Sequence, residues 1–169
     1  CLLAGVLSVA TAIASDSLLN EATQYYEKGE LRSAEIQVKN ALKEIPKMPE
    51  ARLLLGKIYM QKGDYRSAEQ EFERAVRYGA DAIEAYPLLG QAYISQGNAR
   101  KVIDEIKLDN AWDVKTQAAV ASLHGNAYMN LREFDKAEQA FQTALDIDKD
   151  NIDSLMGLVK VFIFKKNYS

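Results

Sequence analysis

The feature of this sequence that most constrains its fold is a motif that returns about every 34 residues. Successive repeats begin near Ser15, Pro49, Ile83, Ala118 and Ile152, with spacings of 34, 34, 35 and 34 residues. A period of about 20–50 residues is typical of chains that stack copies of one supersecondary unit, because a single copy cannot bury its own apolar face. The chain of 169 residues is therefore expected to form a short array of stacked repeats.

Four positions in the repeat indicate how each copy packs. The eighth residue is small in four of five repeats, the eleventh is aromatic in all five, and the twentieth and twenty-seventh are alanine in three of the four complete repeats. Small residues let two antiparallel helices approach closely, whereas the aromatic ring fills the space beside them. The residues are Ala22, Gly56, Gly90, Gly125 and the exception Val159; Tyr25, Tyr59, Tyr93, Tyr128 and Phe162; Ala34, Ala68 and Ala137; and Ala41, Ala75 and Ala144.

Turn signals divide each repeat into two helices. A glycine followed by a polar residue occurs at Gly29-Glu30, Gly63-Asp64 and Gly97-Asn98. Glycine supplies the left-handed backbone that ends one helix, and the polar residue can begin the next. Apolar residues after the second turn recur at helical spacing. The pattern predicts helix–turn–helix units.

These residues make the chain resemble the tetratricopeptide-repeat (TPR) proteins over residues 15–169. The resemblance implies an all-α fold, a TPR α-solenoid of antiparallel helix pairs forming a right-handed superhelix with a concave groove. The expected repeats are 15–48, 49–82, 83–117, 118–151 and an incomplete 152–169.

The third repeat, 83–117, departs from the pattern. Val102 and Asp109 replace the small residues, one residue is inserted, and the stretch KLDNAWDVKTQ lacks the helical periodicity. We expect a short second helix, an irregular link and a local change of superhelix pitch rather than a domain boundary. Trp112 in this link has two interpretations, a plug for the gap left by the short helix or a partly exposed anchor for a partner.

Composition argues against several common kinds of chemistry. The chain has one cysteine, one histidine and a formal net charge of −3. A single cysteine excludes an internal disulfide, and a lone histidine lacks the partners that a triad or metal site requires. No glycine-rich phosphate loop is present, and the near-balanced charge gives no general attraction to nucleic acid. We expect no catalytic residues, metal, cofactor or nucleic-acid partner, and we interpret His124 as a buried or half-buried helix residue.

The TPR resemblance also implies where a partner would bind. In TPR arrays the first helix of each repeat lines the concave groove through a few recurring positions. The side chains at these positions are mostly uncharged and polar, with methionine and isoleucine, which suits an extended peptide. The cluster of basic residues that clamps a terminal carboxylate in some TPR proteins is not present. The predicted partner-binding residues are Leu53, Lys57, Met60, Gln61, Gln91, Ile94, Ser95, Asn126, Met129 and Asn130, with Pro87 and Ser122 at equivalent positions.

The first fourteen residues form a separate apolar segment. Residues 2–14 carry no charge, but the run is shorter than the ~20 residues of a membrane-spanning helix. Ala12-Ile13-Ala14 has the small-x-small form of a signal-peptide cleavage site. We expect residues 1–14 to be the remnant of an export signal. A lipidated Cys1 and a plain N-terminal helix are the alternatives.

A closer resemblance concerns roughly residues 18–108. The segments YYEKGELRSAEIQVKNAL, ARLLLGKIYMQKGDYRSAE and YPLLGQAYISQGNARKVIDEI resemble the N-terminal part of the PEP-CTERM system TPR-repeat lipoproteins. The resemblance implies export in a Gram-negative bacterium, a role in exopolysaccharide production or PEP-CTERM protein sorting, and further TPR units C-terminally. It also supports the alternative that Cys1 is lipidated, because such proteins commonly carry a lipidated cysteine.

Together these inferences predict a non-enzymatic scaffold of the periplasm or cell envelope that binds protein or peptide segments in its groove. Contact with a membrane is expected only through a lipid anchor on Cys1, at the outer membrane. Two alternatives stay open, an outer-membrane assembly or chaperone-like TPR lipoprotein, and the regulatory repeat region of a larger enzyme.

Overall fold

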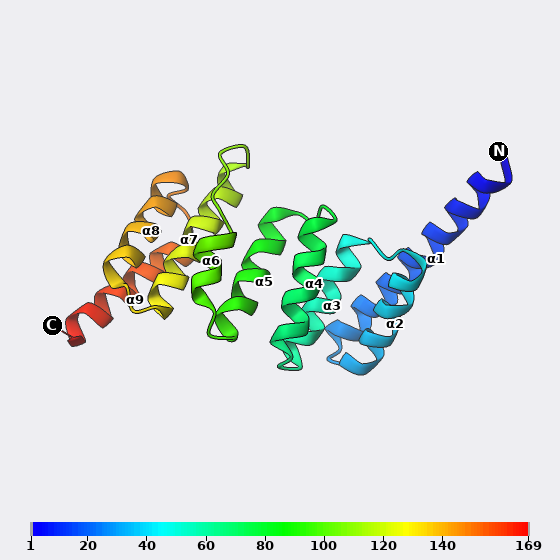
Figure 1. Cartoon of the computed structure of the whole chain (residues 1–169), viewed down its shortest axis with the longest axis horizontal. Coiled ribbons are helices and arrows are strands. Elements are labelled where there is room, and N and C mark those ends of the chain that lie inside the picture. The colour runs from blue at the N-terminus through cyan, green and yellow to red at the C-terminus, as the bar shows by residue number, and fades with distance from the viewer. Residues whose placement is uncertain (1, 169) are drawn as a thin grey trace. The chain divides into compact units, whose positions relative to one another are not determined.

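The computed structural model describes the backbone of residues 2–168 and the side chains of residues 14–166. All regular secondary structure in this range is α-helical, which confirms the predicted all-α fold (Figure 1). The chain divides into an N-terminal body, Cys1–Asp81, and a C-terminal body, Ala82–Ser169. The helices are α1 (Leu2–Glu27), α2 (Leu31–Glu44), α3 (Pro49–Gln61), α4 (Tyr65–Arg77), α5 (Ala82–Ser95), α6 (Ala99–Glu105), α7 (Val114–Asn130), α8 (Phe134–Ile147) and α9 (Ile152–Tyr168).

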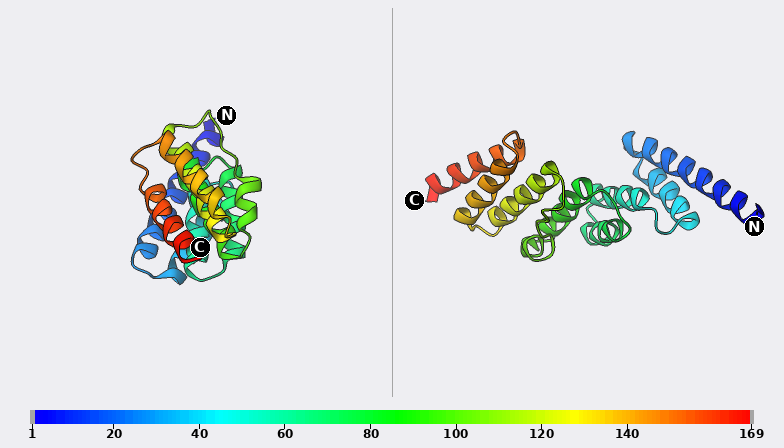
Figure 2. Two further views of the ribbon diagram at one scale, coloured as in Figure 1. Left: turned by 90° about the vertical axis from the view of Figure 1, so that its left-hand side faces the viewer. Right: turned by 90° about the horizontal axis from the view of Figure 1, so that it is seen from above.

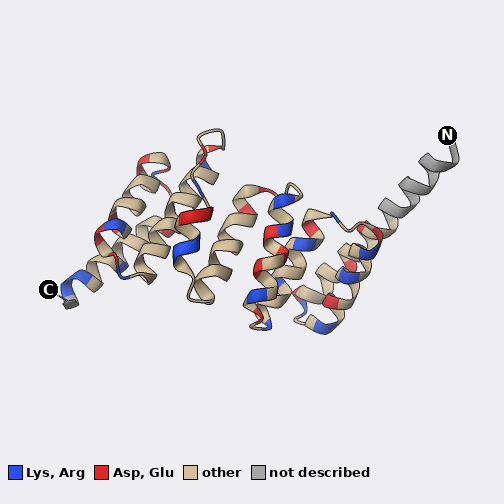
Figure 3. Cartoon of the chain, viewed as in Figure 1, with Lys and Arg blue, Asp and Glu red and all other residues tan. Residues whose placement is uncertain are grey.

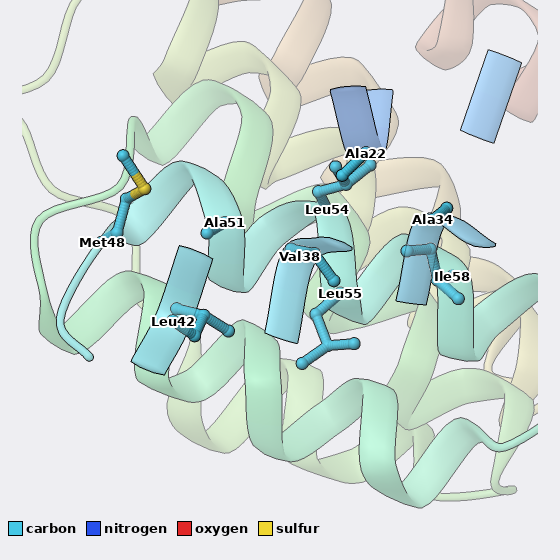
Figure 4. Packing of buried hydrophobic residues seen from close by; sticks show 9 residues of the cluster. All are labelled: Ala22, Ala34, Val38, Leu42, Met48, Ala51, Leu54, Leu55 and Ile58. Atoms are coloured by element: carbon cyan, nitrogen blue, oxygen red, sulfur yellow. The ribbon is translucent and has the colours of Figure 1, made fainter. Parts of the chain in front are cut away.

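The N-terminal body consists of two helical hairpins, α1–α2 and α3–α4, with α2 packed against α3. Its core is built from the apolar faces of the first three helices (Figure 4). The small residues of the repeat pattern are completely buried there, so the two helices of a hairpin can approach closely. The core residues are Ala22, Ala34, Val38, Leu42, Met48, Ala51, Leu54, Leu55 and Ile58.

The turns inside the hairpins have the predicted left-handed backbone. Gly29, Gly63 and Gly97 have φ angles of 76°, 75° and 77°. At the first of these turns the amide of Gly29 donates to the carbonyl of Tyr26 over 3.0 Å, and that of Glu30 to Tyr25 over 2.9 Å. The sequence of the fourth repeat lacks the glycine signal, and there Arg132 adopts the left-handed backbone of the equivalent turn, at φ 59°.

The C-terminal body is centred on α7, which packs against α5, α6, α8 and α9. Two further views of the ribbon show its hairpins (Figure 2). The ring of Phe141 on α8 is buried between two glycines. A Cβ atom added to Gly125 of α7 would lie 2.5 Å from this ring, and one added to Gly157 of α9 would lie 2.6 Å from its Cε2 atom. Glycine at both sites therefore permits the three helices to pack around one aromatic side chain.

The third repeat has the expected short second helix and irregular link. Helix α6 has only seven residues, and α7 begins at Val114. Asp113 caps α7, since its carboxylate accepts hydrogen bonds from the amides of Lys115 and Thr116. The Thr116 hydroxyl also donates to this carboxylate, and these bonds hold the pKa of Asp113 below its usual value. The division of the chain falls before this repeat, at Asp81, and not inside it.

The aromatic residues at position eleven are less uniformly buried than the sequence predicts. Only Tyr93 is fully buried, whereas Tyr25, Tyr59 and Tyr128 are half-buried. Tyrosine has a polar end that remains near water while the ring packs on the core. Phe162 is 68% exposed because it lies on α9, the last of the described helices.

The apolar N-terminal segment lies within α1, which runs without a break from Leu2 to Glu27. Cys1, predicted as a lipidation candidate, lies outside the described residues. Among the residues that are described, no helix combines the length and apolar character needed to cross a membrane.

Candidate functional site

A groove on the C-terminal body is lined by α5, α7 and α9 and has a volume of about 350 Å³. Ligand sites in proteins begin at about 300 Å³, so this groove can receive side chains of a partner. It brings together four of the ten residues predicted for partner binding. These are Gln91, Ile94, Asn126 and Asn130, which share the groove with Pro87, Ser122, Ala119, Leu123 and Asp153.

Helical spacing explains why these side chains share one surface. Ser122, Asn126 and Asn130 are four residues apart on α7, so they project from one face of the helix. Pro87 and Gln91 have the same spacing on α5. The helix repeat therefore aligns two rows of groove residues.

The two rows lie close together because α5 carries a glycine at the point of contact. A Cβ atom on Gly90 would lie 2.6 Å from the methyl carbons of Leu123 on α7. The small residue at position eight of the third repeat thus brings α5 against α7, as the repeat pattern predicts.

Several polar groups of the groove have no partner in the described part of the chain. Ser122 is only 2% exposed, and its hydroxyl makes no hydrogen bond there. Leaving a buried hydroxyl unpaired costs about 1–3 kcal/mol. The amide groups of Gln91 and Asn126 also make no side-chain hydrogen bond among the described residues, whereas Asn130 donates to the Asn126 carbonyl over 2.9 Å. The groove therefore offers a buried hydroxyl and two uncommitted amides.

The lining of the groove carries a negative charge. Asp153, in the first turn of α9, is the one ionisable residue among the lining residues, and it forms no ion pair in the described part of the chain. Helix α5, which forms one side of the groove, carries few charged residues, whereas α4 of the N-terminal body carries charges of both signs (Figure 3). No lysine or arginine lines the groove.

The remaining predicted residues do not line this groove. Met129 packs against the core cluster around Phe141, and Ser95 is exposed at the end of α5. In the N-terminal body Leu53 is buried, with 5% of its surface exposed, and its role as a groove residue stays a prediction. Burial is favourable for a leucine on a helix that is apolar on several faces.

The other three predicted residues of the N-terminal body stay near its surface. Lys57 and Met60 are half-buried, and Gln61 is exposed. The Gln61 amide donates to the hydroxyl of Tyr26 on α1 over 2.9 Å, so it is committed to a contact between helices.

Sequence reasoning missed Ala119, Leu123 and Asp153. Ala119 and Asp153 occupy the second position of their repeats, which is one of the recurring groove positions of TPR arrays but for which no residue was predicted. Applying that rule to position two of the fourth and fifth repeats would have found them. The unpaired hydroxyl of Ser122 has no sequence signal, because it depends on the arrangement of neighbouring helices.

A second cleft lies beside the link that follows α6, on the C-terminal body. It has a volume of about 330 Å³ and is lined in part by Leu108, His124, Tyr128 and Lys136. Nε2 of His124 lies 2.5 Å from the Ile106 carbonyl oxygen, and burial lowers the pKa of the imidazole. The prediction of a half-buried His124 is confirmed.

The predicted role of Trp112 as a plug agrees with its position. Its ring is half-buried, and its centroid lies 5.1 Å from that of Tyr86 on α5, with the planes tilted by 41°. The carbonyl of Trp112 also accepts a hydrogen bond from Gln117 over 2.6 Å. The link is therefore attached to helices on both sides.

The N-terminal body carries a charged cluster on its surface. Glu35 on α2 accepts hydrogen bonds from Lys39 over 2.5 Å and from Lys62 over 2.6 Å. Hydrogen bonds from these two ammonium groups lower the pKa of Glu35, and the bond to Glu35 raises the pKa of Lys39. Both ammonium groups lie within 6 Å of the Tyr59 ring centroid. The cluster satisfies its own charges and leaves no evident binding group.

Comparison with known proteins identifies the repeats. Family models of the tetratricopeptide repeat match residues 20–89 and residues 125–151. No curated protein sequence matches the chain.

Solved structures of TPR proteins share the fold. YrrB, a TPR protein with an unusual peptide-binding site, is 19% identical, with a TM-score of 0.63 over 89% of this chain and 77% of its own. PilF of Pseudomonas aeruginosa is 13% identical, with a TM-score of 0.71 over 94% and 72%. A thermophilic TPR protein of Thermus thermophilus, TTC0263, is 22% identical, with a TM-score of 0.65 over 90% and 83%. The chain is therefore an all-α TPR solenoid built of tetratricopeptide repeats.

Proposed function

We propose that this chain is a non-enzymatic interaction scaffold that binds an extended peptide segment in the groove of its C-terminal body. TPR repeats are protein-interaction modules, which supports the general role. The observation that carries the specific site is the pair of uncommitted amides, Gln91 and Asn126, in one groove. Side-chain amides both donate and accept, so they can pair with the backbone of a bound segment.

The apolar part of the groove supports the same class of ligand. Pro87, Ile94 and Leu123 provide surface for small apolar side chains next to the amides. An extended peptide presents backbone polar groups and side chains in alternation, which this mixture can accommodate. The peptide-binding site of the structurally similar YrrB adds support for a peptide as the ligand.

We propose the cell envelope of a Gram-negative bacterium as the place of action, with a role in exopolysaccharide production or PEP-CTERM protein sorting. Two sequence features support this proposal, the uncharged run at residues 2–14 and the resemblance over residues 18–108. Fractionation of cells that express the native gene tests it. Recovery in periplasmic or membrane fractions is expected, and recovery with cytosolic markers alone would contradict it.

We also propose that a helix of a further repeat covers the outer face of α9. Seven large apolar side chains are exposed on this helix. Several of their counterparts one repeat earlier on α7, such as Ala121 and Gly125, are buried, because α7 is covered by α8 and α9. The exposed residues are Ile152, Leu155, Met156, Val159, Phe162, Ile163 and Phe164.

Selection from a displayed random peptide library, followed by mutation of the groove, tests the peptide-binding proposal. Peptides that bind the wild-type chain are measured by fluorescence anisotropy against the double variant Gln91→Ala/Asn126→Ala. We expect at least about tenfold weaker binding, because two hydrogen bonds of about 1 kcal/mol each are lost. The matched control, Gln24→Ala/Gln70→Ala, removes two exposed amides outside the groove and should bind normally. Equal affinity of the groove variant and wild type would refute the assignment.

A further inference from the structure

The charge and burial of the groove residues indicate which chemical class of ligand can bind there. Asp153 is the one ionisable residue of the lining, and it has no ion-pair partner in the described part of the chain. The groove contains no lysine or arginine that could receive a carboxylate. A cationic group of a ligand would gain an ion pair at Asp153, whereas an acidic group would meet a like charge.

A second observation is independent of charge. Ser122 lines the same groove, is nearly completely buried, and its hydroxyl has no hydrogen-bond partner among the described residues. The equivalent position in the other repeats holds an apolar residue, so packing of the repeat does not require a hydroxyl there. Those residues are Leu19, Leu53, Pro87 and Met156. Ser154 on α9 is also buried without a hydroxyl partner but does not line the groove, whereas Ser122 does, so a ligand bound in the groove can supply the hydrogen bond that Ser122 lacks.

A structural role for Asp153 has to be separated from a binding role. An acidic residue in the first turn of a helix is favourable because it lies near the positive end of the helix dipole. Glu50 holds the same position at the start of α3 in the second repeat. The amide of Ser154 donates to the Asn151 side chain over 2.9 Å, so the start of α9 already has a cap. The carboxylate of Asp153 is thus free for another role.

We infer that the groove selects a basic peptide segment, in which a lysine or arginine pairs with Asp153 and a neighbouring polar group of the ligand hydrogen-bonds to the hydroxyl of Ser122. This inference rests on the proposed peptide-binding function and adds the chemical class of the ligand. It also sets this groove apart from TPR grooves that clamp an acidic terminus with basic residues.

The composition of selected peptides tests the charge preference. A displayed random peptide library is selected on the whole chain, and the frequency of each residue is compared with the unselected library. We expect lysine and arginine to be enriched at one position of the bound peptides and aspartate and glutamate to be depleted. In a parallel selection on Asp153→Asn this enrichment should disappear, whereas Glu50→Gln, the matched control, should retain it.

Variants of the two residues separate binding from stability. For a selected basic peptide, Asp153→Asn and Ser122→Ala should each weaken binding about three- to tenfold. Raising the salt concentration should weaken binding to wild type more than binding to Asp153→Asn, because only the former retains the ion pair. Ser122→Ala should unfold at the same or higher urea concentration than wild type, since it removes an unpaired buried hydroxyl. Loss of stability in this variant would instead assign Ser122 to the core and overturn its role.

The outcomes distinguish this inference from the function on which it rests. Peptides whose binding depends on Gln91 and Asn126 but shows no basic preference would overturn the inference and leave the groove assignment intact. Enrichment of acidic peptides would overturn it as well. Peptides that bind independently of these two amides, or a library that yields no binders, would refute the groove assignment and with it the inference.

Discussion

Gly56 of α3 faces the ring of Phe72, which is completely buried on α4. A Cβ atom at Gly56 would lie 2.6 Å from the Cδ1 atom of this ring, too close for two carbon atoms. Because a buried ring cannot move away without disturbing its neighbours, Gly56→Ala should lower the free energy of unfolding by about 1–3 kcal/mol. Urea denaturation followed by circular dichroism measures this change.

A second substitution distinguishes the steric clash from a change in helix propensity. Alanine is the better helix former, so propensity alone would make Gly56→Ala stabilising. In a background with Phe72→Leu the smaller side chain relieves the clash, and the two substitutions together should cost less than the sum of their separate costs. Additive costs would show that the contact between residues 56 and 72 is not the cause.

Some residues of the helix packing and of the groove were predictable from the sequence, and others were not. Gly56, Gly90 and Gly125 were predictable because the repeat places a small residue at each close crossing of two helices. Position in the repeat also predicted four groove residues. At Leu53 the same repeat position is buried in the N-terminal body, and the prediction there stays untested. The unpaired Ser122 hydroxyl depends on distances between helices, which no sequence pattern reports.

At the scale of elements, His124 attaches α7 to the link that follows the short α6. Burial lowers the pKa of its imidazole from the ordinary value, so the folded state favours the neutral ring. A group whose folded pKa is depressed binds more protons when unfolded, and stability then decreases as pH falls. Between about pH 7.5 and 5.5 the wild type should lose more stability than His124→Gln, because the variant does not titrate in this range.

Urea midpoints of the two proteins at several pH values measure this difference. The range lies above the region where the carboxylates with lowered pKa values, such as Glu35 and Glu133, become protonated. Parallel curves for wild type and His124→Gln would contradict the prediction, since they would show that the imidazole has the same pKa in both states.

Helix α9 is the element that we expect to cause self-association. Its exposed apolar face should promote self-association, and Phe162→Glu should reduce it because a charge replaces a side chain that is 68% exposed. Sedimentation velocity at several concentrations measures the effect, with little change in the free energy of unfolding expected. Val161→Glu is the contrasting variant, since Val161 is buried and a charge there should destabilise the helix packing. Association that is unchanged by Phe162→Glu would rule out this face as its source.

At the scale of the whole molecule, the period of 34 residues predicted the helical hairpins, and the structure confirms an all-α TPR solenoid. The weak second helix of the third repeat was also readable, because Val102 and Asp109 break the small-residue pattern. The division of the chain into two bodies at Asp81 was not predictable from the sequence. Local repeat signals report packing inside a hairpin, whereas a division of the chain reflects packing between hairpins.

The central claim, that the groove between α5, α7 and α9 binds a peptide, is tested most directly by nuclear magnetic resonance. Side-chain amide signals of Gln91 and Asn126 are followed while a library-selected peptide is added to the isotope-labelled chain. We predict that these signals and the backbone amides of neighbouring groove residues shift in proportion to the bound fraction. Shifts confined to other surfaces, such as the charged cluster around Glu35, with the groove signals unchanged, would contradict the account.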